Sequence, residues 1–388
     1  MRIGIDARFY GKAGPGRYTK SIVQHLEKID IRNKYIIFLD KDGFEEYAPR
    51  NKNFTKVLAD YTWYSFEEQT KLLWAVLKQK LDIYYVPHFN IPVLYPGKIV
   101  TAIPDMTMHK HSTRFSTTLP QWYFLFKKCV YKMVFWWAVL RSYKVIVPSK
   151  TVLMDFMKYL NFNESKYVVA YEGVDPDFFK TCSDPQKVLD KFNITKNFIL
   201  YVGSMYEHKN VPRLIKMYKI LKTKYNYDGQ FVLVSKRDEF SRKIYEQVAA
   251  DGYAGDIIFP AYSVEMPTKM IERSIVVSDG EIVALRQRAS VYVIAALTEG
   301  FSLTALEGMI HGLPAVISDI DCHREVYGNS VMYFDPKNVK HMACQVDKMI
   351  GDKDLQRKYI KRGYEQVKKY DWTETAKITL AIFEETRH

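Results

Sequence analysis

Two glutamates, Glu299 and Glu307, stand eight residues apart and are the pair whose type and spacing could do chemistry. They bracket a Gly-Phe-Ser turn and the start of an apolar helix, directly after a strand-like run at 291–296. Open α/β sheets bind ligands at the carboxyl ends of their strands. There, two carboxylates could grip one elongated ligand at two points or act as an acid and a base. A solvated Glu307, favoured only by the helix dipole, is the alternative.

A lysine occupies a comparable place earlier in the chain. The strand-like run at 198–202 ends at Gly203-Ser204, and Lys209 precedes a helix that Asn210 could cap. A lysine beside a helix start can neutralise a phosphate whose oxygens also accept helix N–H groups. We predict a phosphate contact for Lys209, with a solvated loop lysine as the alternative.

The N-terminal half offers two further candidate segments. Gly14 and Gly16 lie between the first strand and the first helix, where glycine lets backbone approach a ligand closely. The spacing is not that of a dinucleotide fingerprint, so an ordinary strand-to-helix turn stays an alternative. His88 and Asp105 follow two later strands, where an imidazole and a carboxylate could bind acceptor hydroxyls or adjust protonation.

Composition limits the partners and the compartment. The net charge of +13 predicts an anionic partner, and the absence of any nucleic-acid-binding signature argues against RNA and DNA. The four cysteines are scattered and form no Cys-x-x-Cys pair, so we predict a reducing cytosol and no metal site. No signal peptide and no apolar run of about 20 residues is present, which predicts a cytoplasmic protein without a membrane span.

Strand-like and helical runs alternate throughout, as expected for parallel α/β sheets. The predicted strands lie at 2–8, 35–39, 83–86, 99–103, 144–147, 167–171, 198–202, 231–234, 257–259, 291–296 and 315–318. The predicted helices lie at 17–27, 65–78, 119–140, 150–160, 211–221, 241–249, 280–288 and 303–311, and 339–386 is helical and charged. We predict two Rossmann-like domains, 1–175 and 198–370, joined by a linker at 176–197 and separated by a ligand-binding cleft.

The helix at 119–140 combines large aromatic residues with lysines, including Lys127, Lys128 and Lys132. This mixture suits a helix lying on an anionic lipid surface. It equally suits a core helix whose lysines extend to the solvent. The lysines rule out a membrane span, and both alternatives stay open.

Taken together, these segments resemble the GT-B glycosyltransferases of family 4, which are retaining enzymes. The resemblance covers nearly the whole chain and rests on an ordered series of motifs. They are Gly4-Ile-Asp-Ala-Arg8 with Gly14-Pro-Gly16-Arg-Tyr18, Pro148-Ser149-Lys150, Gly173-Val174-Asp175, Gly203-Ser204 with His208-Lys209-Asn210, Glu299-Gly300-Phe301 with Leu306-Glu307, Gly312-Leu-Pro314, and His323-Arg-Glu-Val326. In this fold the C-terminal helix, here 371–388, packs back on the N-terminal domain.

The resemblance implies a role for each matching residue. Glu299 would hold the donor sugar's hydroxyls, Glu307 the ribose, and Lys209 the diphosphate, without a metal ion or other cofactor. Gly16 would let the N-terminal domain close over the diphosphate. The substrate-binding residues would further include Gly14, His88, Ser204, Gly300, Phe301, Ser302 and Leu303, and Asp105 would act beside Glu299 and Lys209 in catalysis. Many relatives carry Arg where Ser204 stands and His where Pro104 stands.

By this resemblance the chain would move a hexose, with mannose from GDP-mannose as the specific expectation. The acceptor would be a glycan or lipid-linked glycan in surface polysaccharide biosynthesis, at the inner face of the cell membrane. A GT-B sugar-nucleotide epimerase or phosphorylase is one alternative. A non-catalytic module that binds nucleotide sugars is the other.

Overall fold

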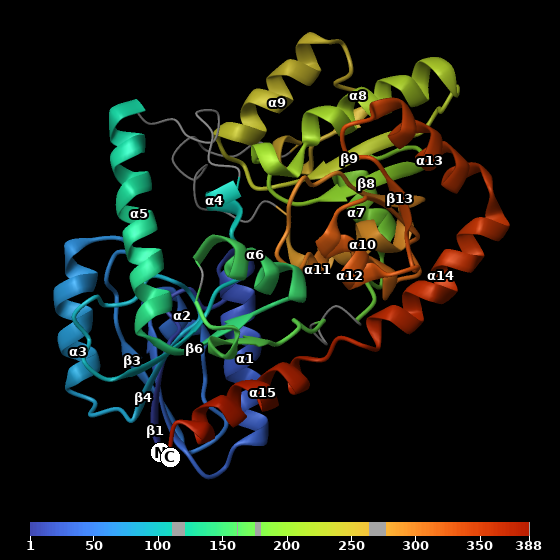
Figure 1. Cartoon of the computed structure of the whole chain (residues 1–388). Helices are drawn as coiled ribbons and strands as arrows, with labels where there is room; N and C mark the ends of the chain where they lie inside the picture. The colour runs from blue at the N-terminus through green and yellow to red at the C-terminus, as the bar shows by residue number, and fades with distance from the viewer. Residues whose placement is uncertain (111–120, 161, 175–179, 264–276, 388) are drawn as a thin grey trace. The chain divides into compact units, whose positions relative to one another are not determined.

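The computed structural model describes the chain except for residues 111–120, 161, 175–179, 264–276 and 388. The side chains of residues 13, 108 and 121–124 are not described either. The chain forms two compact units (Figure 1). Unit 1 comprises Met1–Met106, Thr117–Gly173 and Asp371–His388, and unit 2 comprises Thr107–Ser116 and Val174–Tyr370.

Unit 1 is built on a seven-stranded parallel sheet with the order β3-β2-β1-β4-β5-β6-β7. Its strands are β1 (Arg2–Asp6), β2 (Lys34–Leu39), β3 (Phe54–Leu58), β4 (Ile83–Val86), β5 (Lys98–Ala102), β6 (Ser142–Val147) and β7 (Tyr167–Val169). Its helices are α1 (Ala13–Ile29), α2 (Lys41–Glu46), α3 (Leu73–Leu77), α5 (Gln121–Arg141), α6 (Lys150–Leu160) and α15 (Trp372–Glu385). A π-helical turn, Glu68–Leu72, leads into α3.

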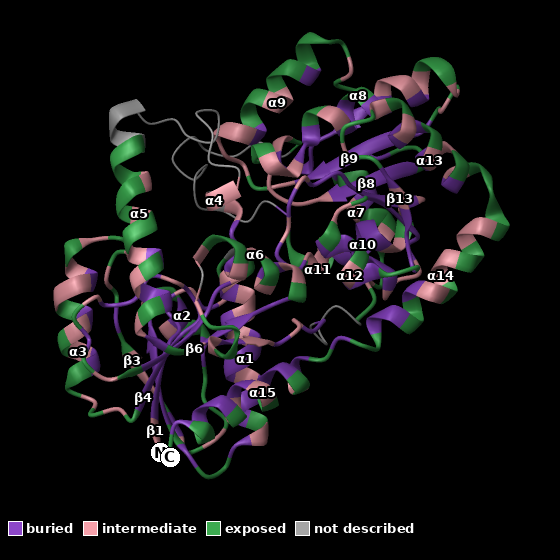
Figure 2. Ribbon diagram, in the orientation of Figure 1, coloured by how far each residue is buried: buried purple, intermediate pink, exposed green. Residues whose placement is uncertain are grey.

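Both faces of this sheet are covered, so neighbouring strand residues pack against different helices. Tyr84 of β4 belongs to an apolar cluster with α3 and α5, whereas the Tyr85 ring contacts Phe383 of α15. The inner strands are accordingly buried along most of their length and the edge strands β3 and β7 are partly exposed, while the helices of this unit are buried mainly on one side (Figure 2).

Where the chain passes from one unit to the other, the two crossing segments contact each other within each unit. In unit 1, Gly173 lies against the backbone of Trp372, so closely that a Cβ would overlap it. In unit 2, the N–H of Val174 donates to the carbonyl of Tyr370 at 3.3 Å. Helix α15 then packs along α1, where the Tyr18 and Trp372 rings meet edge to face.

Unit 2 holds a six-stranded parallel sheet with the order β10-β9-β8-β11-β12-β13. Its strands are β8 (Phe198–Val202), β9 (Gln230–Val234), β10 (Ile257–Ile258), β11 (Val291–Ile294), β12 (Ala315–Ser318) and β13 (Met332–Phe334). Its helices are α4 (Thr107–Lys110), α7 (Pro185–Lys191), α8 (Val211–Lys224), α9 (Glu239–Ala250), α10 (Asp279–Arg288), α11 (Leu303–Met309), α12 (Asp321–Tyr327), α13 (Val339–Gly351) and α14 (Lys353–Val367).

These two parallel sheets confirm the predicted fold class of two α/β domains. Six strands and α-helices of the described part were not predicted from the sequence: β3, β13, α2, α4, α7 and α12. The segment predicted as a linker, 176–197, contains helix α7, because Asp184 caps its start and Pro185 suits its first turn. Helix α7 packs against α10 in unit 2, and residues 175–179, including Asp175 and Asp177, lie outside the described part.

Candidate active site

Lys209 and Glu299 form an ion pair at the carboxyl edge of the sheet of unit 2. The Nζ of Lys209 donates to Oε1 of Glu299 at 2.6 Å, and both side chains are largely buried. Lys209 lies in a short 3-10 turn after β8, and Glu299 follows β11, the strand next to β8. The structure therefore brings together two residues that are ninety positions apart in the chain.

The surroundings keep Glu299 ionised. Burial alone would raise its pKa, but the charge and hydrogen bond of Lys209, with smaller effects of His323 and His208, lower the pKa below the ordinary value. A carboxylate held ionised in a buried place can accept hydrogen bonds from hydroxyl groups but has no proton to give at neutral pH. The acid–base interpretation of the Glu299–Glu307 pair finds no support in this geometry.

Asn210 holds the Lys209 turn in place. Its backbone adopts the left-handed conformation, with φ of 61°. Its side-chain amide donates to the carbonyls of Ala295 at 3.0 Å and Pro336 at 2.9 Å, although Asn210 makes no side-chain cap bond to α8. The turn is thereby fastened to the ends of β11 and β13 instead of resting on α8 alone.

Glu307 is buried, which excludes the alternative of a solvated helix residue. It lies in α11 with only 3% of its surface exposed. Arg286 of α10, 1% exposed, donates through Nη2 to its Oε2. No cation stands near Glu307 in the sequence, so this partner could be found only in the folded chain. An ion pair this deeply buried fixes the direction of the carboxylate.

The turn between the two glutamates is tightly constrained. Ser302 has φ of 73°, a conformation that a residue with a side chain rarely adopts, and its carbonyl accepts from the Tyr327 hydroxyl. The ring of Phe301 is buried against Tyr370, with 5.2 Å between centroids. Because this ring is buried, only the backbone of Phe301 can make the predicted ligand contact. Gly300 precedes it in the turn, and Leu303 begins α11.

Gly14 and Gly16 differ in their surroundings. A Cβ at Gly16 would overlap the carbonyl oxygen of Phe9, so that position requires glycine for packing. At Gly14 nothing described lies within 4 Å of an added Cβ. Gly16 therefore closes the strand-to-helix turn, and only Gly14 borders open space.

His88 is fixed by a buried polar network in unit 1. The network runs from Asp6 through Arg8 and Glu68 to Asn90, all nearly without exposure, with Arg8 bonded to Asp6 at 2.9 and 2.8 Å. The backbone N–H of Asn90 donates to Nδ1 of His88 at 3.1 Å. Burial lowers the pKa of His88 to about 4, so the ring is neutral at pH 7 and carries its proton on Nε2. His88 is thus a hydrogen-bond donor.

Aromatic rings surround His88, among them Trp63 and Tyr64, which the sequence interpretation missed. Trp63 stacks on Phe9 at 3.5 Å between centroids and also carries the Arg8 guanidinium 3.9 Å above its ring. Tyr64, largely exposed and with φ of 57°, packs against His88 as well. Neither residue belongs to a regular element, so no periodic pattern singled them out. Rings beside a hydrogen-bond donor form a surface suited to a sugar.

Two predicted site residues have less defined surroundings. Asp105, half-buried after β5, lies near α5, because its charge contributes to the raised pKa of Tyr131. The carbonyl of Ser204 accepts a hydrogen bond from the Tyr201 hydroxyl at 2.6 Å, which orders the turn after β8.

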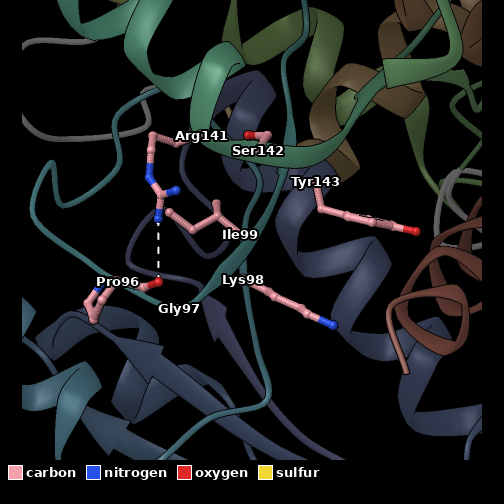
Figure 3. A pocket seen from close by; sticks show the side chains of 7 residues that line it. All are labelled: Pro96, Gly97, Lys98, Ile99, Arg141, Ser142 and Tyr143. Atoms are coloured by element: carbon pink, nitrogen blue, oxygen red, sulfur yellow. Dashed lines mark hydrogen bonds between the residues drawn. The ribbon is translucent and has the colours of Figure 1, made fainter. Parts of the chain in front are cut away.

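A shallow hollow lies at the other end of the sheet of unit 1, between the amino ends of β5 and β6 (Figure 3). Its arginine, Arg141, donates to the carbonyls of Tyr95 and Pro96 at 3.2 and 3.5 Å. Lys98 donates to the carbonyl of Thr386. These cations already serve the chain's own carbonyls, and the hollow is at the edge opposite His88, so we assign it no role in the site.

The exposed face of α5 is apolar. Phe135, Ala138 and Val139 are buried against unit 1. On the opposite side the exposed apolar residues are Leu125, Phe126, Val130, Met133, Trp136 and Leu140. One side of the helix is therefore core, and the other carries an unusual exposed apolar stripe; the lipid-surface alternative stays a prediction. The predicted residues before 121 lie outside the described part, as do the side chains of 121–124.

Among the described residues, no helix combines the length and apolar character needed to cross a membrane. Nor do three or more His, Cys, Asp or Glu side chains gather in that part of the chain as a metal site would require.

The chain is similar to known proteins both in family and in sequence. Residues 186–366 match the family described as glycosyl transferases group 1. The O-antigen chain mannosyltransferase RfbU of Salmonella typhimurium strain LT2 is 22% identical over 85% of this chain and 86% of its own length. The O-antigen chain mannosyltransferase B of Escherichia coli is also 22% identical, over 94% of this chain and 93% of its own.

A solved structure extends the likeness to the whole fold. The Anabaena protein Alr3699/HepE in complex with UDP and glucose aligns with a TM-score of 0.73. The alignment covers 99% of this chain and all of that one, at 13% identity. Such a likeness concerns the fold alone, and it confirms the predicted GT-B fold class with two parallel-sheet domains.

Proposed function

We propose, from the premise that this chain is a GT-B glycosyltransferase whose residues 186–366 form a group 1 domain, that it transfers a hexose from a nucleotide diphosphate sugar with retention of configuration. Mannose from GDP-mannose is the donor we propose, because two relatives along most of the chain are named mannosyltransferases. The acceptor is a glycan or lipid-linked glycan of a surface polysaccharide. We place the enzyme in family 4 and in the cytoplasm.

The Lys209–Glu299 pair is the observation that carries this proposal. The pair lies at the carboxyl edge of a parallel sheet, where ligands bind. Its ammonium and carboxylate are 2.6 Å apart, so a single ligand can contact both charges. The diphosphate attracts the ammonium, and the hexose hydroxyls donate to the carboxylate. Glu307, held by Arg286, is positioned to accept from a ribose. Stabilising the leaving diphosphate by fixed positive charge needs no metal ion.

His88 and the rings of Trp63 and Tyr64 are our candidate for acceptor binding. An imidazole N–H and aromatic faces suit a sugar's hydroxyls and its apolar ring face. Asp105, which follows the neighbouring strand, supplies a carboxylate for the same ligand.

Two substitutions test the donor assignment. We expect Lys209→Ala and Glu299→Gln each to reduce transfer from GDP-mannose at least about a hundred-fold, because charge stabilisation of this kind contributes that much. Lys219→Ala is the matched control, since Lys219 forms a similar 2.6 Å pair with Asp251 along α8 and α9. Near-normal transfer in the first two variants, with any nucleotide sugar that the wild type uses, would overturn the proposal.

The same assay separates the alternatives. An epimerase would rearrange the donor's sugar without an acceptor, and a phosphorylase would require inorganic phosphate. A non-catalytic module would bind the nucleotide sugar without hydrolysing or transferring it. NMR of the anomeric proton in the product tests retention.

We propose further that the exposed stripe of α5 lies on an anionic membrane. Lys127 and Lys132 are exposed, and the helical period puts them on the two sides of the stripe, so anionic head groups can meet them while the apolar side chains enter the interface. Flotation with vesicles containing phosphatidylglycerol tests this. Phe126→Glu with Met133→Glu should abolish flotation, and unchanged flotation would contradict the proposal.

A further inference from the structure

His323 in α12 is a buried histidine whose ring the site described above does not use. It follows β12 and has no exposed surface. Its Nδ1 lies 2.8 Å from the carbonyl oxygen of Ser318 and 3.1 Å from that residue's hydroxyl oxygen. These two contacts fasten one side of the ring to the end of β12.

The hydrogen bonds determine where the ring carries its proton. A carbonyl oxygen can only accept, so Nδ1 must donate to Ser318. The Ser318 hydroxyl donates its only hydrogen to the carbonyl of Ala296, at 2.7 Å, so it cannot also donate to the ring. Burial lowers the pKa of His323 to about 4, which leaves the ring neutral at pH 7. The other nitrogen, Nε2, therefore bears a lone pair and no hydrogen.

That lone pair has no donor. Nε2 is buried and lacks a hydrogen-bond partner anywhere in the described part of the chain. Buried polar atoms in native proteins nearly always have a partner, because leaving one without costs free energy. An acceptor retained in this state indicates a group that arrives from outside.

The ring lies with the proposed donor-binding residues. The charges of Glu299 and Lys209 both act on His323. Ser318 and Ala296, to which it is linked, close β12 and follow β11, and Glu299 comes shortly after Ala296. The orphaned nitrogen thus belongs to the carboxyl edge where Lys209 and Glu299 meet.

We propose that Nε2 of His323 accepts a hydrogen bond from one hydroxyl of the donor hexose and so selects a sugar that has a hydroxyl there. This inference rests on the proposed function. Glu299 is also an acceptor, so the ligand between the two must offer hydrogens, as a hydroxylated sugar does.

Two substitutions at this position separate binding from structure. The short amide of His323→Asn can keep the bond to the Ser318 carbonyl, but it removes the acceptor at Nε2. The longer amide of His323→Gln places a carbonyl oxygen near Nε2 and gives up the Ser318 bond. If His323 were merely structural, the Asn variant would be tolerated better than the Gln variant. If His323 binds the sugar, the Gln variant should bind the sugar nucleotide better than the Asn variant does.

Calorimetry measures binding of GDP, UDP, GDP-mannose and UDP-glucose, followed by deoxyfluoro analogues of whichever sugar nucleotide the wild type prefers. We expect His323→Asn to bind the free nucleotide normally and the sugar nucleotide about ten-fold more weakly, with His323→Gln closer to wild type. On the wild type, one deoxyfluoro analogue should bind about ten-fold more weakly than the parent sugar nucleotide, because fluorine cannot donate a hydrogen bond. On His323→Asn the same analogue should bind as well as the parent. His25→Leu is the control, since His25 is likewise buried and bonded through Nδ1 to a carbonyl, but in unit 1.

The role of His323 is overturned if His323→Asn weakens binding of the free nucleotide as much as binding of the sugar nucleotide. It is also overturned if every analogue weakens binding to His323→Asn as much as it weakens binding to the wild type. Neither result affects the proposed donor. A wild type that binds none of the four probes overturns the proposed donor and this inference together.

Discussion

Replacing Arg286 by methionine should destabilise unit 2 by about 3–5 kcal/mol, the usual effect of removing one member of a buried ion pair. The pair qualifies because the side chains of Arg286 and Glu307 are only 1% and 4% exposed. Methionine keeps most of the side-chain volume, so the loss comes from the charge that stays behind. Glu307 would be left as a buried carboxylate facing an apolar neighbour.

The companion substitutions make the magnitude specific. Glu307→Gln alone should also destabilise unit 2, because it leaves the arginine buried without its counter-charge. The double variant should recover at least about 2 kcal/mol relative to the sum of the single effects, since neither charge is then isolated. Arg324→Met is the control: Arg324 and Asp319 are 54% and 42% exposed, and such a pair contributes about 0.5 kcal/mol.

The tryptophans provide a way to assign the effect to one unit. All six lie in unit 1, so tryptophan fluorescence reports that unit alone, whereas far-UV circular dichroism reports both. In urea, Arg286→Met should lower the midpoint of the dichroism transition of unit 2 and leave the fluorescence transition where it was.

An effect no larger than that of Arg324→Met, or a double variant as unstable as the sum of the singles, would refute the reasoning. Donor binding supplies a second readout. Arg286→Met should weaken binding of free GDP, in which the ribose is present and the hexose is not.

Three further predictions concern single positions. Gly16→Ala should destabilise unit 1, because its Cβ overlaps the Phe9 carbonyl, whereas Gly14→Ala should leave stability unchanged; equal thermal shifts would contradict this. Burial lowers the pKa of His88 and of His323 from an ordinary 6.5 to about 4, so the fold favours the neutral rings. Their contribution to stability is complete above pH 6.5. As the pH falls from 6.5 to 4 each should lose about 3 kcal/mol, and His323→Gln should flatten that pH dependence for unit 2. Asn210→Ala should destabilise the turn after β8 by about 2 kcal/mol, because two buried carbonyls lose their donor; urea midpoints against the wild type would measure it.

The order of strands and helices was predictable because most buried strands are short apolar runs between helical ones. Strand β3 escaped, because Thr55 and Lys56 interrupt its apolar character. Lys56 fits there by extending to the carbonyls of Phe44 and Tyr47, at 2.7 and 3.1 Å. That compensation depends on α2, which was itself not predicted, so no local pattern could reveal it.

The candidate site divides in the same way. Lys209 and Glu299 were predictable because each follows a strand end, and parallel strands bring such ends to one edge. The partners that make the site specific were not. Arg286 reaches Glu307 from another helix, and the lone pair of His323 is visible only once the hydrogen bonds around Ser318 are counted. These are properties of contacts between elements, not of spacing along the chain.

The closure between Val174 and Tyr370 has a consequence for how such proteins are assembled. A stretch whose first and last residues are hydrogen bonded can be cut out of one gene and placed into another without stretching either host. Here that stretch, 174–370, also contains the whole matched group 1 region. The gap it would leave is already closed by Gly173 against Trp372. Chimaeras exchanged at these two junctions therefore offer a way to test whether donor choice follows the exchanged stretch and acceptor choice the remainder, as proposed.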